Sequence, residues 1–457
     1  MQKINHKHQM ILFILLASYS MLVIDNSIVI TGLPTIQSQL TFTPEKLSWV
    51  QNAYMLCFGG FMLLGARAGD IFGSLKVFLL GLLVFTLSSL VISLSNSANL
   101  LIGARAIQGL GAAVLSPATL TLLTKNFSEG AERNRAISWY GAIGGITASL
   151  GLVAGGIIAN FISWRAGFFI NVPIGLFLML TAPKYITETD RHNGKLDITG
   201  AILSTISMIC LVYGLIQAAE SGFGNAYTSV LFFIFVLSLL LFIQLERKID
   251  SPLLPLRIFL SKERSGAYIA RILFTGSAMG FFFYTTQYLQ SILHMNAFQA
   301  GIAFFPSMIV NFLGALLAPR LSKRFSHSTV LLGAIVISFI GMLLLGFGMA
   351  TSSFWFGVMV PMILVGSCMG AAMALLTVLG VSKVSHQDAG AASGVVGVAH
   401  QVGGAFGIAL LVLVSSLSSH SSNNLLNVQQ QGMCNAMFAG ATLLAICFIT
   451  VFSLNRK

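Results

Sequence analysis

Long apolar stretches recur along the whole chain, and they constrain the fold more than any other feature. Each holds about 18–25 residues, enough for one helix to cross the roughly 30 Å hydrocarbon core of a membrane. Only 8% of residues are charged, against about 25% in soluble domains, so a soluble fold is excluded. We predict an all-α polytopic membrane protein with fourteen transmembrane helices at residues 10–33, 47–66, 76–95, 100–123, 136–160, 164–183, 197–218, 227–245, 266–289, 299–319, 328–349, 353–377, 390–415 and 433–454.

The basic residues indicate how these helices are oriented. With fourteen spans, nearly all Lys and Arg side chains fall on the side of the N-terminus; only Lys46 and Arg165 fall on the other side, and Arg105 and Arg271 lie within helices. Cytoplasmic loops are enriched in Lys and Arg, so we predict a multi-pass protein of the cytoplasmic membrane with both termini in the cytoplasm. The same rule explains the net charge of +12 without a nucleic-acid partner.

The two longest internal connectors divide the chain into three parts. They lie at residues 183–197 and 246–266 and bracket one pair of helices. We predict an N-terminal six-helix half (residues 1–183), linkers with an inserted helix pair (184–265), and a C-terminal six-helix half (266–457). Pseudo-symmetric halves of this kind are typical of transporters.

Two opposite charges are predicted within the membrane. Asp25 lies in the first helix and Arg105 in the fourth, and at 1.5 Å per residue both sit about 10–14 Å below the surface opposite the N-terminus. A pair would lower the cost of burying either charge. Two interpretations stay open: a structural bridge, or a carboxylate that carries a proton beside an arginine that cannot lose its own.

Two further stretches are distinctive. "GARAGDIFGSLK" (65–76) connects the second and third helices; there Asp70 could accept bonds from helix-end amides and Gly73 would permit a tight turn, although a solvated turn is an equally good explanation. The fifth helix is rich in glycine over residues 141–175, which favours close packing and bending.

Together these stretches resemble the major facilitator superfamily, specifically its fourteen-helix drug:proton antiporter family, over nearly the full length. The resemblance rests on motif residues in helices one to five and on "SWRAGFFINVPIG" after them: Asp25, Leu33, Pro34, Trp49, Tyr54, Arg67, Gly69, Asp70, Gly73, Lys76, Arg105, Gln108, Gly109, Gly111, Ala113, Pro117, Gly151, Gly155 and Gly156.

The resemblance implies roles for several of these residues. Asp25 and Arg105 would be the proton-coupling carboxylate and the arginine that controls it. Four connector residues would form a conformational latch: Arg67, Asp70, Gly73 and Lys76. The glycines of the fifth helix, Gly151, Gly155 and Gly156, would serve the exchange geometry.

Aromatic and polar residues suggest where a substrate could bind. "GFFFYTTQYLQ" (280–290) could line an aromatic cavity, and we place Phe283, Tyr284 and Gln287 there together with Tyr54 and Gln108. Arg271 could reach lipid headgroups or meet an anionic substrate, and His400 could titrate or simply pack. Glu220 is expected at the end of the seventh helix.

The sequence predicts a secondary transporter rather than an enzyme. No nucleophile–base set, metal cluster, cofactor motif or phosphate-binding loop stands out, so we expect no metal, no cofactor and no direct use of ATP. We predict export of small, lipophilic or drug-like molecules in exchange for protons, by a monomer in the lipid bilayer. Export of a specific metabolite or siderophore, proton-coupled import, and a non-transporting receptor or scaffold are the alternatives.

Overall fold

The computed structural model describes residues 6–189, 196–249, 252–384, 388–417 and 425–454. In the described part of the chain, the regular structure is helical throughout. Its elements, in chain order, are α1 His6–Leu40, α2 Pro44–Leu47, α3 Trp49–Phe72, α4 Ser74–Ser93, α5 Ala98–Asn126, α6 Ala131–Phe161, α7 Trp164–Phe169, α8 Asn171–Tyr185, α9 Ile198–Ser221, α10 Ala226–Lys248, η1 Leu256–Leu260, α11 Lys262–Ser291, α12 Ala297–Ala303, α13 Phe305–Phe325, α14 His327–Ala350, η2 Trp355–Met359, α15 Val360–Gly380, α16 Ala389–Ser416 and α17 Leu425–Leu454.

Within the described residues, fourteen helical segments are long and apolar enough to cross a membrane, as predicted. Four of these spans combine two elements: α2 with α3, α7 with α8, α12 with α13, and η2 with α15. The first span is longer than predicted, running from Lys7 to Leu40. Its polar end, "TIQSQL", continues the helix beyond the apolar stretch, where hydropathy gives no signal but backbone hydrogen bonding still favours a helix.

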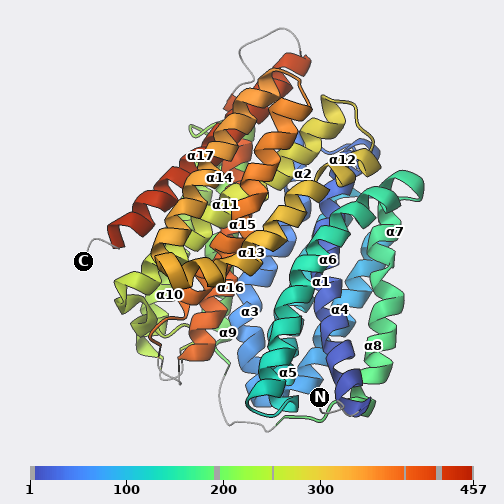
Figure 1. Cartoon of the computed structure of the whole chain (residues 1–457), viewed down its shortest axis with the longest axis vertical. Helices are drawn as coiled ribbons and strands as arrows, with labels where there is room; N and C mark the ends of the chain where they lie inside the picture. Colours follow the sequence, from blue (N-terminus) through green and yellow to red (C-terminus); the bar gives the residue numbers. More distant parts are fainter. Residues whose placement is uncertain (1–5, 190–195, 250–251, 385–387, 418–424, 455–457) are drawn as a thin grey trace.

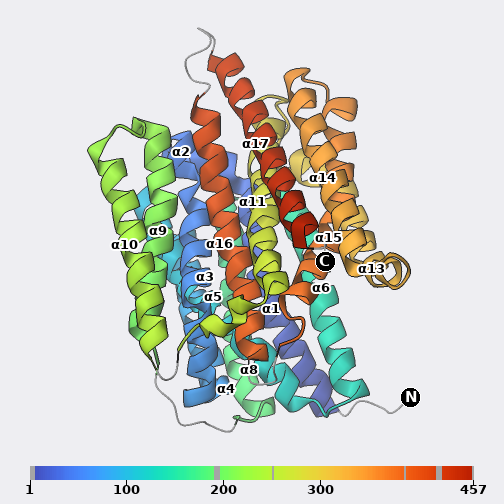
Figure 2. The same cartoon turned by 90° about the vertical axis from the view of Figure 1, so that its left-hand side faces the viewer.

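The helices form two groups and a peripheral pair (Figures 1 and 2). Helices α1 and α3–α8 pack mainly against one another, as do α11 and α13–α17. Helices α9 and α10 pair with each other at the edge of the bundle, and α9 contacts both α3 and α16. This arrangement is compatible with two halves and an inserted helix pair, and that division of the chain stays a prediction.

Apolar side chains cover the outside of the bundle. In α4, Leu80, Leu83, Leu87 and Val91 follow one another at helical spacing and are all exposed. In a soluble protein such a continuous apolar stripe would be unfavourable, but a helix facing lipid requires it.

Glycines allow α5 to contact its neighbours through the backbone. A Cβ atom added to Gly111 would lie 2.7 Å from the Phe85 nitrogen of α4, and one added to Gly109 would lie within 2.4 Å of the Tyr54 carbonyl oxygen of α3. Gly103, in the same helix, has nothing within 4 Å of that position. Close packing of small residues substitutes here for the hydrophobic effect, which does not drive helices together in lipid.

Replacing Gly111 by Ala should therefore separate α5 from α4. We expect Gly111→Ala to lower the free energy of unfolding by about 1–3 kcal/mol, because backbone atoms cannot move aside as a side chain can. Gly103→Ala is the matched control and should leave stability almost unchanged. Thermal unfolding of both variants in the same detergent tests this; equal melting temperatures would contradict the assignment of Gly111 to a helix contact.

Candidate functional site

The predicted pair of opposite charges is present and fully buried. The Arg105 Nη1 atom donates to the Asp25 Oδ2 atom at 2.7 Å, and both side chains have 0% exposure. The pair joins α5 to α1. Because an isolated charge in the membrane costs at least about 2.5–3.5 kcal/mol, neither residue would be tolerated at this depth alone.

Three polar side chains complete the site around Asp25. Its Oδ1 atom accepts hydrogen bonds from Gln108 Nε2 and Asn171 Nδ2, both at 2.8 Å. The same Gln108 nitrogen donates to Ser89 Oγ at 2.8 Å, and its oxygen accepts from Arg105 at 2.7 Å. The carboxylate thus receives three N–H donors, two from α5 and one from α8.

Arg105 contacts a backbone carbonyl and an aromatic ring of α3 and a second aromatic ring of α7. Its Nε atom donates to the Val50 carbonyl oxygen at 2.9 Å, and its Cζ atom lies 4.3 Å from the centre of the Tyr54 ring. The Phe168 ring lies 5.6 Å away. A planar guanidinium suits both the carboxylate and the aromatic faces, which an ammonium group would match less well.

Sequence reasoning missed Asn171 and Ser89. Asn171 begins α8 within "FFINVPIG", and Ser89 lies in the apolar stretch of α4; both are buried. The available signal was a polar residue inside an apolar span. Such residues are common enough that this signal alone could not assign them to the Asp25 site.

The connector between α3 and α4 differs from its prediction in one respect. Gly73 makes the turn with a φ of 97°, as expected of a residue that permits a tight turn. However, the acceptors for the first amides of α4 are Thr189 and Glu188, not Asp70. The Ser74 nitrogen donates to Thr189 Oγ1 at 3.0 Å, and the Glu188 carboxylate accepts from the backbone nitrogens of Leu75 at 2.8 Å and Lys76 at 3.2 Å. A carboxylate stabilises the positive end of a helix dipole, and Glu188 follows α8, which packs against α4.

The remaining residues of the predicted latch are not joined. Among the described residues, the side chains of Arg67, Asp70 and Lys76 form no ion pair with one another, and Asp70 is exposed. Their role as a latch stays a prediction.

The glycines of α6 face both groups of helices. A Cβ atom on Gly151 or Gly155 would lie 2.7 Å from Ser27 Cβ or Ile28 Cα of α1, whereas one on Gly156 would lie 2.5 Å from the Ala297 carbonyl oxygen of α12. This helix therefore holds the two groups in backbone contact at the end of the bundle opposite the start of α1.

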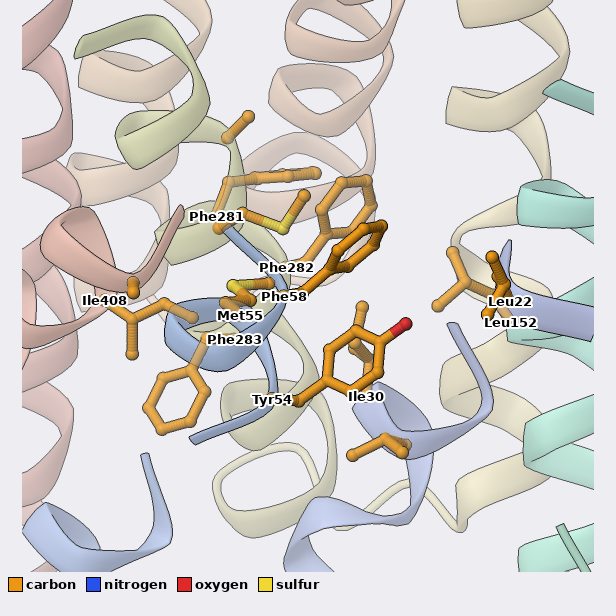
Figure 3. Close-up of a cluster of buried hydrophobic side chains, with 14 of the residues drawn as sticks. Leu22, Ile30, Tyr54, Met55, Phe58, Leu152, Phe281, Phe282, Phe283 and Ile408 are labelled. Carbon is orange, nitrogen blue, oxygen red and sulfur yellow. The ribbon is translucent and has the colours of Figure 1, made fainter. Parts of the chain in front are cut away.

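A central cavity of about 360 Å³ lies between the two groups of helices. Tyr54 and Phe58 of α3 and Phe282 of α11 line it, and they belong to the buried apolar cluster shown in Figure 3. Arg271 and His400 also line this cavity. Arg271 thus faces the interior rather than lipid headgroups. Asp25 does not line the cavity; the Tyr54 ring lies between the cavity and the ion pair.

The structure does not bring together all five residues placed in the substrate cavity. Tyr54 lines the central cavity, and Gln108 belongs to the buried network around Asp25. Phe283, Tyr284 and Gln287 instead line a separate pocket of about 410 Å³ near the far end of α1, together with side chains of α1, α16 and α17. The reason is that successive side chains of a helix point in different directions: on α11, Phe282 points to the central cavity, whereas Phe283 and Tyr284 point to the second pocket.

Glu220 and the five cysteines line neither of these two cavities. Glu220 is exposed at the end of α9. All five cysteines are free thiols. Within the described residues, no group of three or more His, Cys, Asp or Glu side chains could hold a metal ion.

Comparison with known proteins identifies the family. Residues 15–408 match the Major Facilitator Superfamily. The chain is 35% identical over 411 residues to the puromycin resistance protein pur8 of Streptomyces alboniger, covering 89% of this chain and 81% of that one. It is 34% identical over 413 residues to the cephamycin export protein CmcT of Amycolatopsis lactamdurans, covering 89% and 84%. This protein is a membrane transporter, not an enzyme, and it belongs to the Major Facilitator Superfamily.

Solved structures support the same fold. A bacterial homologue of the human lysosomal transporter Spinster, in its inward-facing and unoccupied conformation, superposes with a TM-score of 0.70. The match covers 99% of this chain and 98% of that one at 13% identity, so it speaks for the arrangement of helices alone.

Asn171 offers a test of the buried network. We expect Asn171→Ala to lower the free energy of unfolding by about 1–3 kcal/mol, because Asp25 would lose a donor where no water can replace it. Asn311→Ala is a matched control, since the Asn311 side-chain oxygen lacks a partner among the described residues. Chemical or thermal unfolding in detergent compares them; if both variants lose the same stability, Asn171 is not part of a specific network.

Proposed function

We propose that this transporter exports small, lipophilic or drug-like molecules across the cell membrane in exchange for protons. The observation that carries the proton coupling is the buried Asp25–Arg105 pair, whose carboxylate is the group best placed to bind a proton within the membrane. The names of the relatives, which speak of puromycin resistance and cephamycin export, support export over import. They also favour a drug over a metabolite or siderophore.

Protonation of Asp25 would change the balance of the whole site. A neutral carboxyl group keeps no charge to offset Arg105, and its hydrogen would oppose one of the three N–H donors around it. The guanidinium would then rely more on Val50 and Tyr54 of α3. Since α3 also contacts α16 of the other group, proton binding would bias the packing of the two groups.

The rest of the transport cycle follows from the same proposal. Alternating access would rock the two six-helix halves about the central cavity, with the α9–α10 pair at their edge. Backbone contact at Gly156 would close one side, and the connector with Arg67, Asp70, Gly73 and Lys76 would latch the other in a different state. Both termini would lie in the cytoplasm, and the protein would work as a monomer.

Asp25→Asn tests the proton carrier directly. In inside-out vesicles with an acidic lumen, adding a cephamycin, the drug class named for one relative, should collapse the pH gradient of the wild type. We expect no collapse for Asp25→Asn, because asparagine keeps the shape of the side chain but binds no proton. Glu220→Gln, an exposed acid outside the network, should behave as the wild type. A pH-sensitive dye follows the gradient.

Two outcomes would count against the proposal. Equal collapse in Asp25→Asn and wild type would remove Asp25 as the carrier and leave its bridge with Arg105 structural. Compound uptake that ignores the pH gradient altogether would exclude proton exchange.

A further inference from the structure

Arg271 is the only residue with a permanent charge that lines the central cavity within the described chain. The lining combines apolar and aromatic side chains with amides, hydroxyls and His400, and it contains no Asp or Glu. Asp25 is behind Tyr54 and already paired with Arg105. The cavity therefore presents an excess of positive charge to whatever enters it.

The guanidinium of Arg271 has only neutral partners among the described residues. Its Nη1 atom donates to the Met373 carbonyl oxygen at 2.7 Å and to Thr377 Oγ1 at 3.0 Å. Its Nε atom is buried and donates to nothing. Burying either arginine in the membrane costs free energy. The charge of Arg105 is neutralised by the Asp25 carboxylate. The charge of Arg271 meets no carboxylate among the described residues, so it is available to a ligand.

Other polar groups of the cavity complement that charge. His400 lies beside Thr275 on the same helical group, with Nδ1 at 3.3 Å from the Thr275 hydroxyl. The side-chain oxygen atoms of Asn26 on α1 and Asn311 on α13, which also line the cavity, are buried without a hydrogen-bond donor among the described residues. A ligand could thus receive a charge-assisted bond from Arg271 and donate a bond to an asparagine.

The aromatic lining favours a flat, apolar body for the same ligand. Tyr19 lines the cavity and stacks on Tyr140, with ring centres 3.9 Å apart and planes 19° apart, and Tyr54, Phe58 and Phe282 also line it. Apolar surface of this kind with a few convergent polar groups is typical of small-molecule sites.

We propose that the central cavity binds an aromatic or otherwise flat substrate that bears a carboxylate or a comparable anionic group, with Arg271 as the residue that binds the anion. This inference rests on the proposed function and names its substrate class. A cationic substrate would meet a guanidinium that has no counter-charge among the described residues, between packed helices where like charges repel more strongly than in water. A carboxylate instead matches the planar donor face of arginine.

The electrical consequence distinguishes this class from cationic drugs. An anion that leaves the cell and a proton that enters move charge across the membrane in the same sense. The membrane potential would therefore drive the exchange together with the pH gradient.

Two xanthene dyes of similar size make a matched pair of probes: fluorescein, an anion, and rhodamine 123, a cation. Fluorescence anisotropy with the purified, full-length protein in lipid nanodiscs measures the binding of each. We expect saturable fluorescein binding to the wild type and about 10- to 100-fold weaker binding to Arg271→Gln, the loss of one charge-assisted contact. Arg320→Gln removes the same charge at an exposed position and should bind fluorescein as the wild type does.

The outcomes separate this inference from the proposed function. Absence of saturable fluorescein binding, tighter binding of rhodamine 123, or equal fluorescein affinity in Arg271→Gln would each overturn the anionic substrate class. If the anionic substrate class were overturned but rhodamine 123 were transported at the expense of the proton gradient in inside-out vesicles, the proposed exporter function would stand and the anionic substrate class would not. Conversely, fluorescein binding that depends on Arg271, with no proton-driven uptake of either dye, would keep the site and refute the exchange. If Arg271→Gln melts at a lower temperature than the wild type, its loss of fluorescein binding could reflect misfolding. Arg271→Lys keeps the charge and should restore part of the fluorescein affinity; a lysine variant that folds but does not bind fluorescein would count against the proposal.

Discussion

The ion pair between Arg105 and Asp25 is the interaction on which the N-terminal group of helices depends. Arg105 can be satisfied only if α5 lies within hydrogen-bonding distance of α1 and of the α3 backbone. Gly109, one turn later, makes that approach possible, because any Cβ atom there would strike the Tyr54 carbonyl. Arg105 meets Val50 and Gly109 meets Tyr54, each one turn further along two parallel helices. The buried charge of Arg105 therefore depends on the glycine of α5 that lets this helix approach α3.

Two arginines at membrane depth have opposite surroundings. Arg105 is enclosed by a carboxylate, a carbonyl, an amide and two aromatic rings, and it is shielded from the cavity. Arg271 is bound by two neutral oxygens and borders an open space. A charge on the wall of a cavity can be hydrated or can bind an ion, whereas one inside a helical bundle needs an internal counter-charge. The same residue type thus pairs with a buried carboxylate at one site and, in our proposal, would bind a substrate anion at the other.

Hydropathy and helix geometry were enough to predict the fourteen spans and the meeting of Asp25 with Arg105. Span length follows from membrane thickness, and residue depth follows from the rise per residue. Rotation about the helix axis could not be predicted in the same way. Nearly every side of the middle of α11 is buried, so no polar face shows that Phe282 points to the central cavity while Phe283 and Tyr284 do not. Long-range caps such as Glu188 on α4 leave no local pattern either.

Tyr54 is the physical link between the two proposed sites. One face of its ring lies against the Arg105 guanidinium, and the side chain also lines the cavity in which Arg271 is found. Substrate and proton therefore do not compete for one carboxylate in the proposed cycle; each would act on Tyr54 from its own side. In this proposal, neutralising Asp25 would free Arg105 to move, and a substrate in the cavity would restrict the Tyr54 ring that packs on Arg105. Coupling between the sites then requires only that α3 has two packing arrangements that both ligands bias.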